Sequence, residues 1–168
     1  MRGNMKKPLL GTLLASAAAL LVFASFAAGD AAERAAYKAS VEPICKSNSA
    51  AADRLLGPVK GLVKKDKLKQ AGQAFSKAAV ELEKTQKKLA GVPQPPEDAA
   101  KLGKWLSEIK AEVALMKTIA ANFNKNTKAG KSKATSLAVK LQNNATKANN
   151  NVIVFQFNYC KIDPSKYT

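Results

Sequence analysis

Val152–Cys160, near the end of the chain, has the sequence VIVFQFNYC. It combines β-branched and aromatic residues, carries no charge, and ends in one of only 2 cysteines, whose sole possible intramolecular partner is Cys45. We therefore expect this stretch to fold back over a helical body and to be joined to the first helix by a Cys45–Cys160 disulfide. Alternation of apolar and polar residues favours an extended conformation, and continuation of the preceding helix is the alternative.

A structural bond is the favoured interpretation of the two cysteines. A Cys45–Cys160 bond would close a loop of 115 residues, which adds about 4–5 kcal/mol to the free energy of unfolding in the chain-entropy model. The alternative is that one cysteine is a reactive thiol. The sequence contains no Cys-x-x-Cys motif and no histidine that would activate such a thiol, so a structural role is the better explanation.

Residues 1–29 have the features of a signal peptide. Arg2, Lys6 and Lys7 precede an uncharged, mainly apolar run that small residues close. The alternative is an uncleaved anchor, because the run is long enough to span a bilayer. In either case we expect the remainder outside the cytoplasm, secreted or on the outer face of the cytoplasmic membrane, where disulfides persist. No membrane span is expected once the signal is removed.

Residues 30–162 are expected to form one helical domain, followed by a tail at residues 163–168. Three stretches carry apolar residues in steps of three and four, the pattern of helices that pack nearly parallel or antiparallel to their neighbours. Three such faces with short joints predict an all-α antiparallel bundle of three to four helices. A continuous two-chain coiled coil is the alternative, but glycines and prolines interrupt the helical stretches at regular intervals, which favours the bundle. The three faces are Leu68, Ala71, Phe75, Ala78, Leu82, Leu89; Leu102, Leu106, Ile109, Val113, Met116, Ala120, Phe123; and Ala134, Leu137, Leu141, Ala145, Ala148, Val152.

Glycine and proline set the predicted helix boundaries. Pro43 lies inside the first helix and predicts a kink or a break there, because proline removes a ladder hydrogen bond and clashes with the preceding turn. Residues 59–65 are expected to be a connector. The third long helix is predicted to end at Gly130, and Ser132 is predicted to cap the fourth.

The chain is strongly basic, with a formal net charge of +16. No acidic residue occurs between Glu112 and Asp163. Two lysine clusters predict low-specificity anion binding; a lysine-rich surface that only keeps the protein soluble is the alternative. Arginine, which suits base and phosphate recognition, occurs only as Arg34 and Arg54 after the signal, so we expect no sequence-specific nucleic-acid recognition. The candidate anion-binding residues are Lys60, Lys64, Lys65, Lys67, Lys69, Lys125, Lys128, Lys131 and Lys133.

Residues that usually carry catalysis are scarce. The chain has no histidine, and two cysteines without histidine cannot complete a zinc site, so we expect no metal, no cofactor and no enzymatic activity. Glu108 and Glu112 stand one helical turn apart, and we expect them to form solvated ion pairs with neighbouring lysines. Phe75, Trp105 and Phe123 are expected in the core.

Two short stretches resemble a group of small exported helical proteins of actinobacterial type. They are Tyr37 to Cys45 followed by Asn48, and the aromatic ending Phe157-Asn158-Tyr159-Cys160. In that group a cysteine in the first mature helix is matched by one near the C-terminus. The group is uncharacterised, so the resemblance implies an exported, disulfide-tied bundle and no activity.

Together these observations predict an exported, non-enzymatic binding or structural module of the cell envelope or extracellular space. Its partner would be an anionic envelope polymer, lipid head groups or a protein. The alternative hypothesis is a carrier that holds a small apolar ligand inside the bundle, beneath the stretch from Val152 to Tyr159.

Overall fold

The computed structural model describes residues 18–167, with side chains from residue 30 onward. The signal-peptide prediction for residues 1–29 therefore falls largely outside the described residues. The described part of the chain is helical and contains no strand. Its elements are α1 (Ala18–Leu56), α2 (Val59–Lys64), α3 (Leu68–Ala90), α4 (Ala99–Asn124) and α5 (Lys128–Asn151), with 3₁₀ turns η1 (Pro96–Asp98), η2 (Ile153–Phe155) and η3 (Pro164–Lys166).

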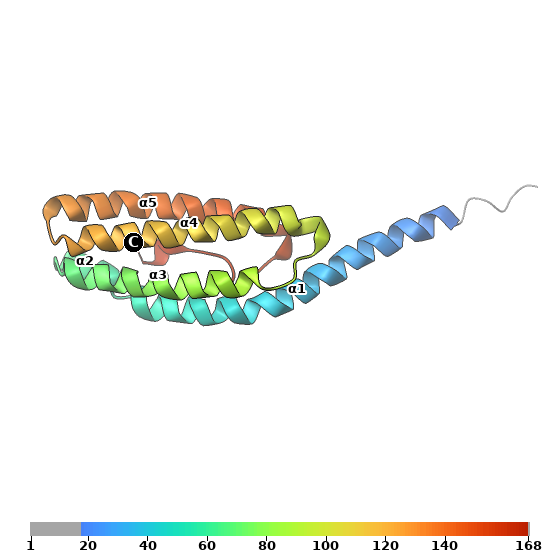
Figure 1. Ribbon diagram of the computed structural model, residues 1–168, viewed down its shortest axis with the longest axis horizontal. Helices are drawn as coiled ribbons and strands as arrows, with labels where there is room; N and C mark the ends of the chain where they lie inside the picture. Colours follow the sequence, from blue (N-terminus) through green and yellow to red (C-terminus); the bar gives the residue numbers. More distant parts are fainter. Residues whose placement is uncertain (1–17, 168) are drawn as a thin grey trace, which may run out of the picture.

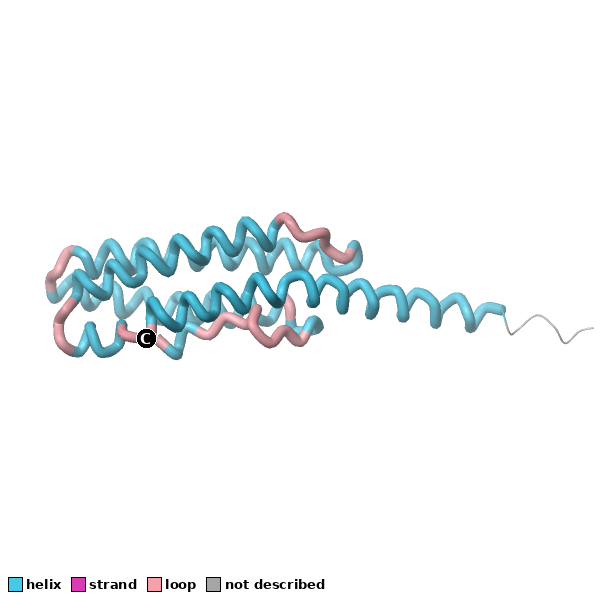
Figure 2. Tube along the Cα trace, turned by 90° about the horizontal axis from the view of Figure 1, so that it is seen from below, coloured by secondary structure: helices cyan, strands magenta, loops and turns pink. Residues whose placement is uncertain are grey.

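The long helices form an antiparallel bundle, which confirms the predicted fold class. α3 packs along α4, α4 along α5, and α1 along α3. Figures 1 and 2 show these helices side by side, with the N-terminal part of α1 projecting from one end. Arg34 in α1 also pairs with the buried Asp98 at the start of α4, at 2.5 Å, which fixes α1 against the α3–α4 joint.

The core is built from the three predicted apolar faces. All of their members are buried, as are the three aromatic side chains Phe75, Trp105 and Phe123. The rings of Phe75 and Phe123 lie 5.9 Å apart and join α3 to α4. The three-and-four spacing therefore predicted the buried surface correctly.

α1 passes through Pro43 without a break. Pro43 is exposed, and Figure 1 shows the helix axis changing direction between the blue and cyan parts of α1. The predicted connector at residues 59–65 is instead largely helical, as α2.

The predicted joint between the last two long helices was wrong by several residues. α4 already ends at Asn124, and Asn126 takes a left-handed conformation with φ of 54°. Thr127, not Ser132, caps α5, because its hydroxyl accepts a hydrogen bond from the backbone N–H of Gly130 at 3.0 Å.

Gly130 therefore lies in the first turn of α5 rather than at the end of a helix. A Cβ atom at this position would collide with the backbone carbonyl oxygen of Asn122 in α4. The glycine allows two helices to approach closely, a role that the spacing of glycines along a sequence does not distinguish from helix termination.

We call residues 152–162 the C-terminal strip. It is neither a strand nor more α-helix: Ile153–Phe155 form a 3₁₀ turn, and Gln156 is left-handed, with φ of 48°. This turn breaks the expected alternation, so Phe155 and Phe157 are buried while Ile153 is 71% exposed. The prediction of a regular extended stretch was wrong.

The expected tail at residues 163–168 is also folded as far as residue 167. Pro164–Lys166 form a 3₁₀ turn. The hydroxyl of Tyr167 donates a hydrogen bond to Asp53 of α1 at 2.5 Å. The end of the chain thus returns to the last turn of α1.

Candidate functional site

The two predicted lysine clusters meet at one end of the bundle. The first cluster lies in α2, the following joint and the first turn of α3; the second follows α4 and occupies the first turns of α5. Figure 1 shows α2 and the α4–α5 turn at the same end, opposite the projecting part of α1. We call the nine lysines Lys60, Lys64, Lys65, Lys67, Lys69, Lys125, Lys128, Lys131 and Lys133 the lysine-rich end.

An ion pair joins the two clusters directly. The ammonium of Lys131 in α5 lies 2.5 Å from a carboxylate oxygen of Asp66, which precedes α3. Asp66 is the only acidic residue in the two stretches, 60–69 and 125–133, that supply the nine lysines. Eight of these lysines are exposed, and Lys131 is half-buried. The charge at this end is therefore concentrated, of one sign and accessible.

One face of α1 holds the C-terminal strip. Cys45 and Cys160 form the predicted disulfide, with an S–S distance of 1.99 Å. The carboxylate of Glu42 accepts hydrogen bonds from the backbone N–H groups of Asn158 and Tyr159, at 2.5 and 2.9 Å. The ammonium of Lys38 donates to the carbonyl of Gln156 at 2.6 Å.

α5 holds the strip from its other side. The side-chain amide of Asn149 donates to the carbonyl of Ile162 and accepts from its N–H, both at 2.9 Å. Sequence reasoning missed these polar attachments. Their signal is weak, since Lys38, Glu42 and Lys46 recur every four residues along one helix face but look like ordinary surface charges.

Aromatic rings anchor the strip to the core. The ring of Phe157 lies 5.6 Å from that of Trp105 and 5.2 Å from that of Phe155, which in turn lies 5.5 Å from Tyr37. These contacts explain why Phe155 and Phe157 are buried while Gln156 between them is exposed: burying a large ring against others adds to the apolar area removed from water.

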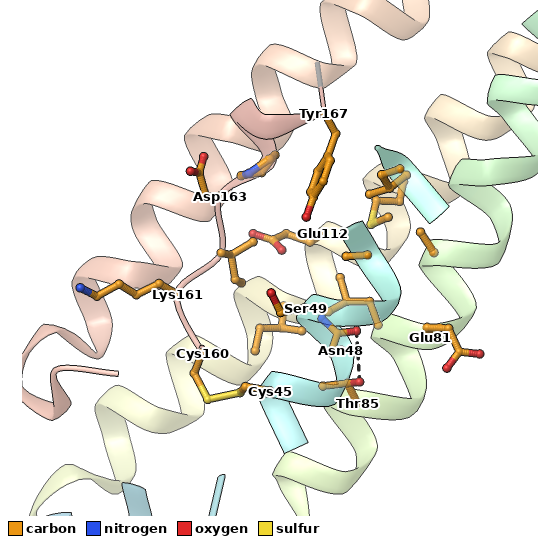
Figure 3. Close-up of a pocket in the computed structure, with 18 of the residues that line it drawn as sticks. Cys45, Asn48, Ser49, Glu81, Thr85, Glu112, Cys160, Lys161, Asp163 and Tyr167 are labelled. Carbon is orange, nitrogen blue, oxygen red and sulfur yellow. Dashed lines mark hydrogen bonds between the residues drawn. A yellow bond between two sulfur atoms is a disulfide. The ribbon is translucent and has the colours of Figure 1, made fainter. Parts of the chain in front are cut away.

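A cavity lies between the bundle and residues 159–167, which we call the C-terminal segment. Its volume is about 110 Å³, and α1, α3, α4, α5 and residues 159–167 all contribute to its wall. Figure 3 shows its lining, including the disulfide and the side chains of Tyr167 and Glu112. Most of the wall is apolar; the inner part comprises Phe75, Ala78, Leu82, Leu89, Trp105, Ile109, Met116 and Leu141.

Glu112 brings a carboxyl group into this apolar wall. Its side chain is 1% exposed, and burial raises its pKa to about 8. Asn144 of α5 donates a hydrogen bond to the carboxyl at 3.4 Å, which favours the charged form, whereas the nearby charge of Glu108 disfavours it. The expected solvated ion pair was therefore wrong: Glu112 is buried, and its raised pKa favours the neutral carboxyl at pH 7.

A signal for this burial is present in the sequence. Trp105, Glu112 and Ile119 are spaced by seven residues, so they share one face of α4. The two apolar members mark that face as core. The expectation of solvated ion pairs with lysines did not take this spacing into account.

Trp105 supplies a second polar group. Its side chain lines the cavity, and its indole N–H is buried without a hydrogen-bond partner among the described residues. A buried donor of this kind is uncommon, because it gives up its hydrogen bond to water.

The described residues contain no group of side chains able to hold a metal ion. Within residues 18–167, no helix is both long and apolar enough to cross a membrane. No protein-family model, no curated protein and no solved structure matches the chain.

Proposed function

We propose that this protein is an exported, non-enzymatic binding module whose lysine-rich end binds anionic polymers or anionic lipid head groups. The convergence of two lysine clusters, far apart in the sequence, on one end of the bundle carries the proposal. Export is supported by the signal-like residues 1–29 and by the Cys45–Cys160 disulfide, because such bonds persist outside the cytoplasm.

The chemistry of lysine determines the kind of binding. An ammonium acts as a point charge on a flexible stem, so the lysine-rich end would recognise charge density rather than one particular arrangement of acceptors. Charges within about 8 Å of one another act together at physiological ionic strength. Binding should therefore be of low specificity and should weaken as salt is added.

A pair of matched variants tests the proposal. The first changes Lys64, Lys65, Lys128 and Lys133, at the lysine-rich end, to glutamine. The second changes Lys87, Lys88, Lys101 and Lys104, at the opposite end of the bundle, to glutamine. Both variants lose the same charge, and all eight side chains are exposed, so neither should disturb the core.

The measurements are the salt concentration that elutes each protein from immobilised heparin and its co-sedimentation with phosphatidylglycerol vesicles. We expect the first variant to elute at clearly lower salt and the second to behave almost like the unchanged protein. Retention on heparin without vesicle binding would identify a polymer as the ligand, and the reverse would identify a membrane surface. Equal losses in both variants would reject the lysine-rich end as the binding site.

A further inference from the structure

The cavity beneath the C-terminal segment is independent of the lysine-rich end and lies in the middle of the bundle. It is open to solvent on one side, because the exposed residues Lys161, Asp163 and Lys166 form part of its wall. Its inner wall is formed by buried apolar side chains of α3, α4 and α5. A molecule could therefore enter beside the C-terminal segment and reach the core.

We propose that this cavity is a binding site for a small, uncharged and mainly apolar molecule that carries one hydrogen-bond acceptor, with the Glu112 carboxyl as the group that recognises this acceptor. Concave, mostly apolar sites with a few convergent polar groups are typical of small-molecule sites in proteins.

The size of the cavity limits the ligand. A dry apolar cavity of about 150 Å³ in another protein binds benzene. The present volume of about 110 Å³ therefore suits a molecule with a single ring or a short alkyl chain. Its partly open side leaves room for a substituent.

The polar groups of the cavity limit the ligand further. Glu112 is almost completely buried, and Figure 3 shows its carboxyl directed into the space enclosed by the lining residues. A neutral carboxyl has one O–H to donate. Trp105, on the same wall, has an indole N–H that lacks a partner among the described residues. Both groups are donors, and the indole N–H has no partner among the described residues, so a ligand with a carbonyl or ether oxygen would supply an acceptor that the protein does not.

Among the described residues, an anionic ligand would find no positive charge beside Glu112 to pair with. No lysine or arginine pairs with its carboxyl in the described structure, and Asn144 and Glu108 are the neighbouring polar groups that act on it. The other titratable side chains in the wall are Glu81 of α3 and Tyr159, Lys161, Asp163, Lys166 and Tyr167 of the C-terminal segment; α1 and α5 contribute none. Ionisation of Glu112 would place an uncompensated charge in the cavity, which disfavours an apolar ligand.

Binding should therefore depend on pH. With a pKa of about 8 for Glu112, most molecules have the neutral carboxyl at pH 6 and about one in ten has it at pH 9. A ligand that binds only the neutral form then binds about 10-fold more weakly at pH 9 than at pH 6.

Trp105 makes the test direct, because it is the only tryptophan of the chain. The protein has one indole N–H resonance, and this resonance reports on the cavity. The probes are acetophenone, which carries a carbonyl oxygen, and ethylbenzene, which has nearly the same shape without it. Each is titrated at pH 6 and pH 9 while the indole resonance and the tryptophan emission are recorded.

Three variants separate the contributions. Glu112→Gln keeps a donor but cannot ionise, so acetophenone should bind with the same affinity at both pH values. Glu112→Met keeps the length and removes the donor, which should weaken acetophenone by about 2- to 10-fold relative to ethylbenzene. Ala78→Leu fills part of the cavity and should abolish saturable binding, whereas Ser76→Leu, on the exposed face of the same helix, should leave it unchanged.

A cavity that holds only water would give no saturable change of the Trp105 signals with either probe, and this result would overturn the proposal. Binding that persists in a folded Ala78→Leu protein would overturn it as well, because the probe would then lie elsewhere. Should Ala78→Leu fail to fold, the comparison of the unchanged protein with Glu112→Gln still decides: equal pH dependence in the two would remove Glu112 from the site.

Discussion

At the scale of single residues, Glu112 has the strongest effect on how the protein should behave. A carboxyl group that is buried among apolar side chains avoids the cost of an unpaired charge by remaining protonated. Its pKa of about 8 compares with an ordinary value of 4.5. The difference links the stability of the fold to pH.

Stability should fall as pH rises through this window. Between the two pKa values the unfolded chain has lost the Glu112 proton while the folded protein still holds it, so folding becomes less favourable by up to about 1.4 kcal/mol per pH unit. The contribution is complete below the unfolded pKa, declines from there to about pH 8, and is constant above it. Glu112→Gln should remove this slope and should be more stable than the unchanged protein at pH 9. Urea unfolding at pH 5, 7 and 9 measures both effects. If the free energy of unfolding changed equally with pH in the two proteins, this would contradict a buried, neutral carboxyl.

Two glycines of neighbouring helices should respond oppositely to the same substitution. Gly103 is exposed in α4, and an added Cβ meets nothing within 4 Å, so Gly103→Ala should stabilise the protein by about 0.5–1 kcal/mol through its higher helix propensity. Gly130→Ala should destabilise it by about 1–3 kcal/mol, because the added methyl would meet the carbonyl of Asn122. Thermal melts of the two variants give the comparison. A stabilised Gly130→Ala protein would show that α4 and α5 do not approach closely at this point.

At the scale of elements, the C-terminal strip is attached by several kinds of interaction at once. The disulfide joins it to α1, and the Glu42 carboxylate accepts hydrogen bonds from two of its N–H groups. The rings of its own residues Phe155 and Phe157 are buried in the core. Apart from the short 3₁₀ turn at Ile153–Phe155, the strip has no regular secondary structure to stabilise it. Its position therefore depends on these contacts rather than on local propensity.

Removal of the disulfide should loosen the strip and lower global stability. The bond closes a loop of 115 residues, so replacing Cys45 and Cys160 by serine should reduce the free energy of unfolding by about 4–5 kcal/mol in the chain-entropy model. The helices should still form, because their apolar faces remain. Denaturant unfolding gives the first quantity, and hydrogen exchange of the Asn158 and Tyr159 amides shows whether the strip has been released. Unchanged stability together with unchanged exchange would mean that the polar and aromatic contacts suffice without the bond.

At the scale of the whole molecule, the antiparallel arrangement determines which charges lie together. Three hairpin-like reversals bring the starts of α3 and α5 and the end of α4 to the same end as α2. Lysines separated by about 60 positions in the sequence thereby become neighbours, as the Lys131–Asp66 pair shows. The projecting part of α1 lies at the other end, so the lysine-rich end faces away from it.

Much of this architecture could be predicted from local pattern alone. The buried faces of α3, α4 and α5 follow from apolar residues in steps of three and four, because a helix places such residues on one side. The joint between α4 and α5 could not be placed in this way. Gly130 resembles a helix terminator in the sequence, and only the close approach of Asn122 reveals its packing role.

The candidate sites were predictable to different degrees. The nine lysines stand out by charge, but their meeting at one end depends on helix directions that no short window of sequence contains. A ligand inside the bundle was only the alternative hypothesis, and Glu112 was wrongly expected in a solvated ion pair, although the seven-residue spacing from Trp105 to Ile119 points to a buried position.

The local pattern of residues was enough to predict the long helices, the faces that they bury, and the pairing of Cys45 with Cys160, because helix periodicity and cysteine number do not depend on the fold. The packing of the helices brings the lysines to one end (Figure 1), places residues 159–167 over a cavity, and buries a surface-like glutamate so that its pKa rises. These features arise where segments distant in the sequence meet, and the environment that sets a pKa, a cavity or a local charge density exists only after they have met.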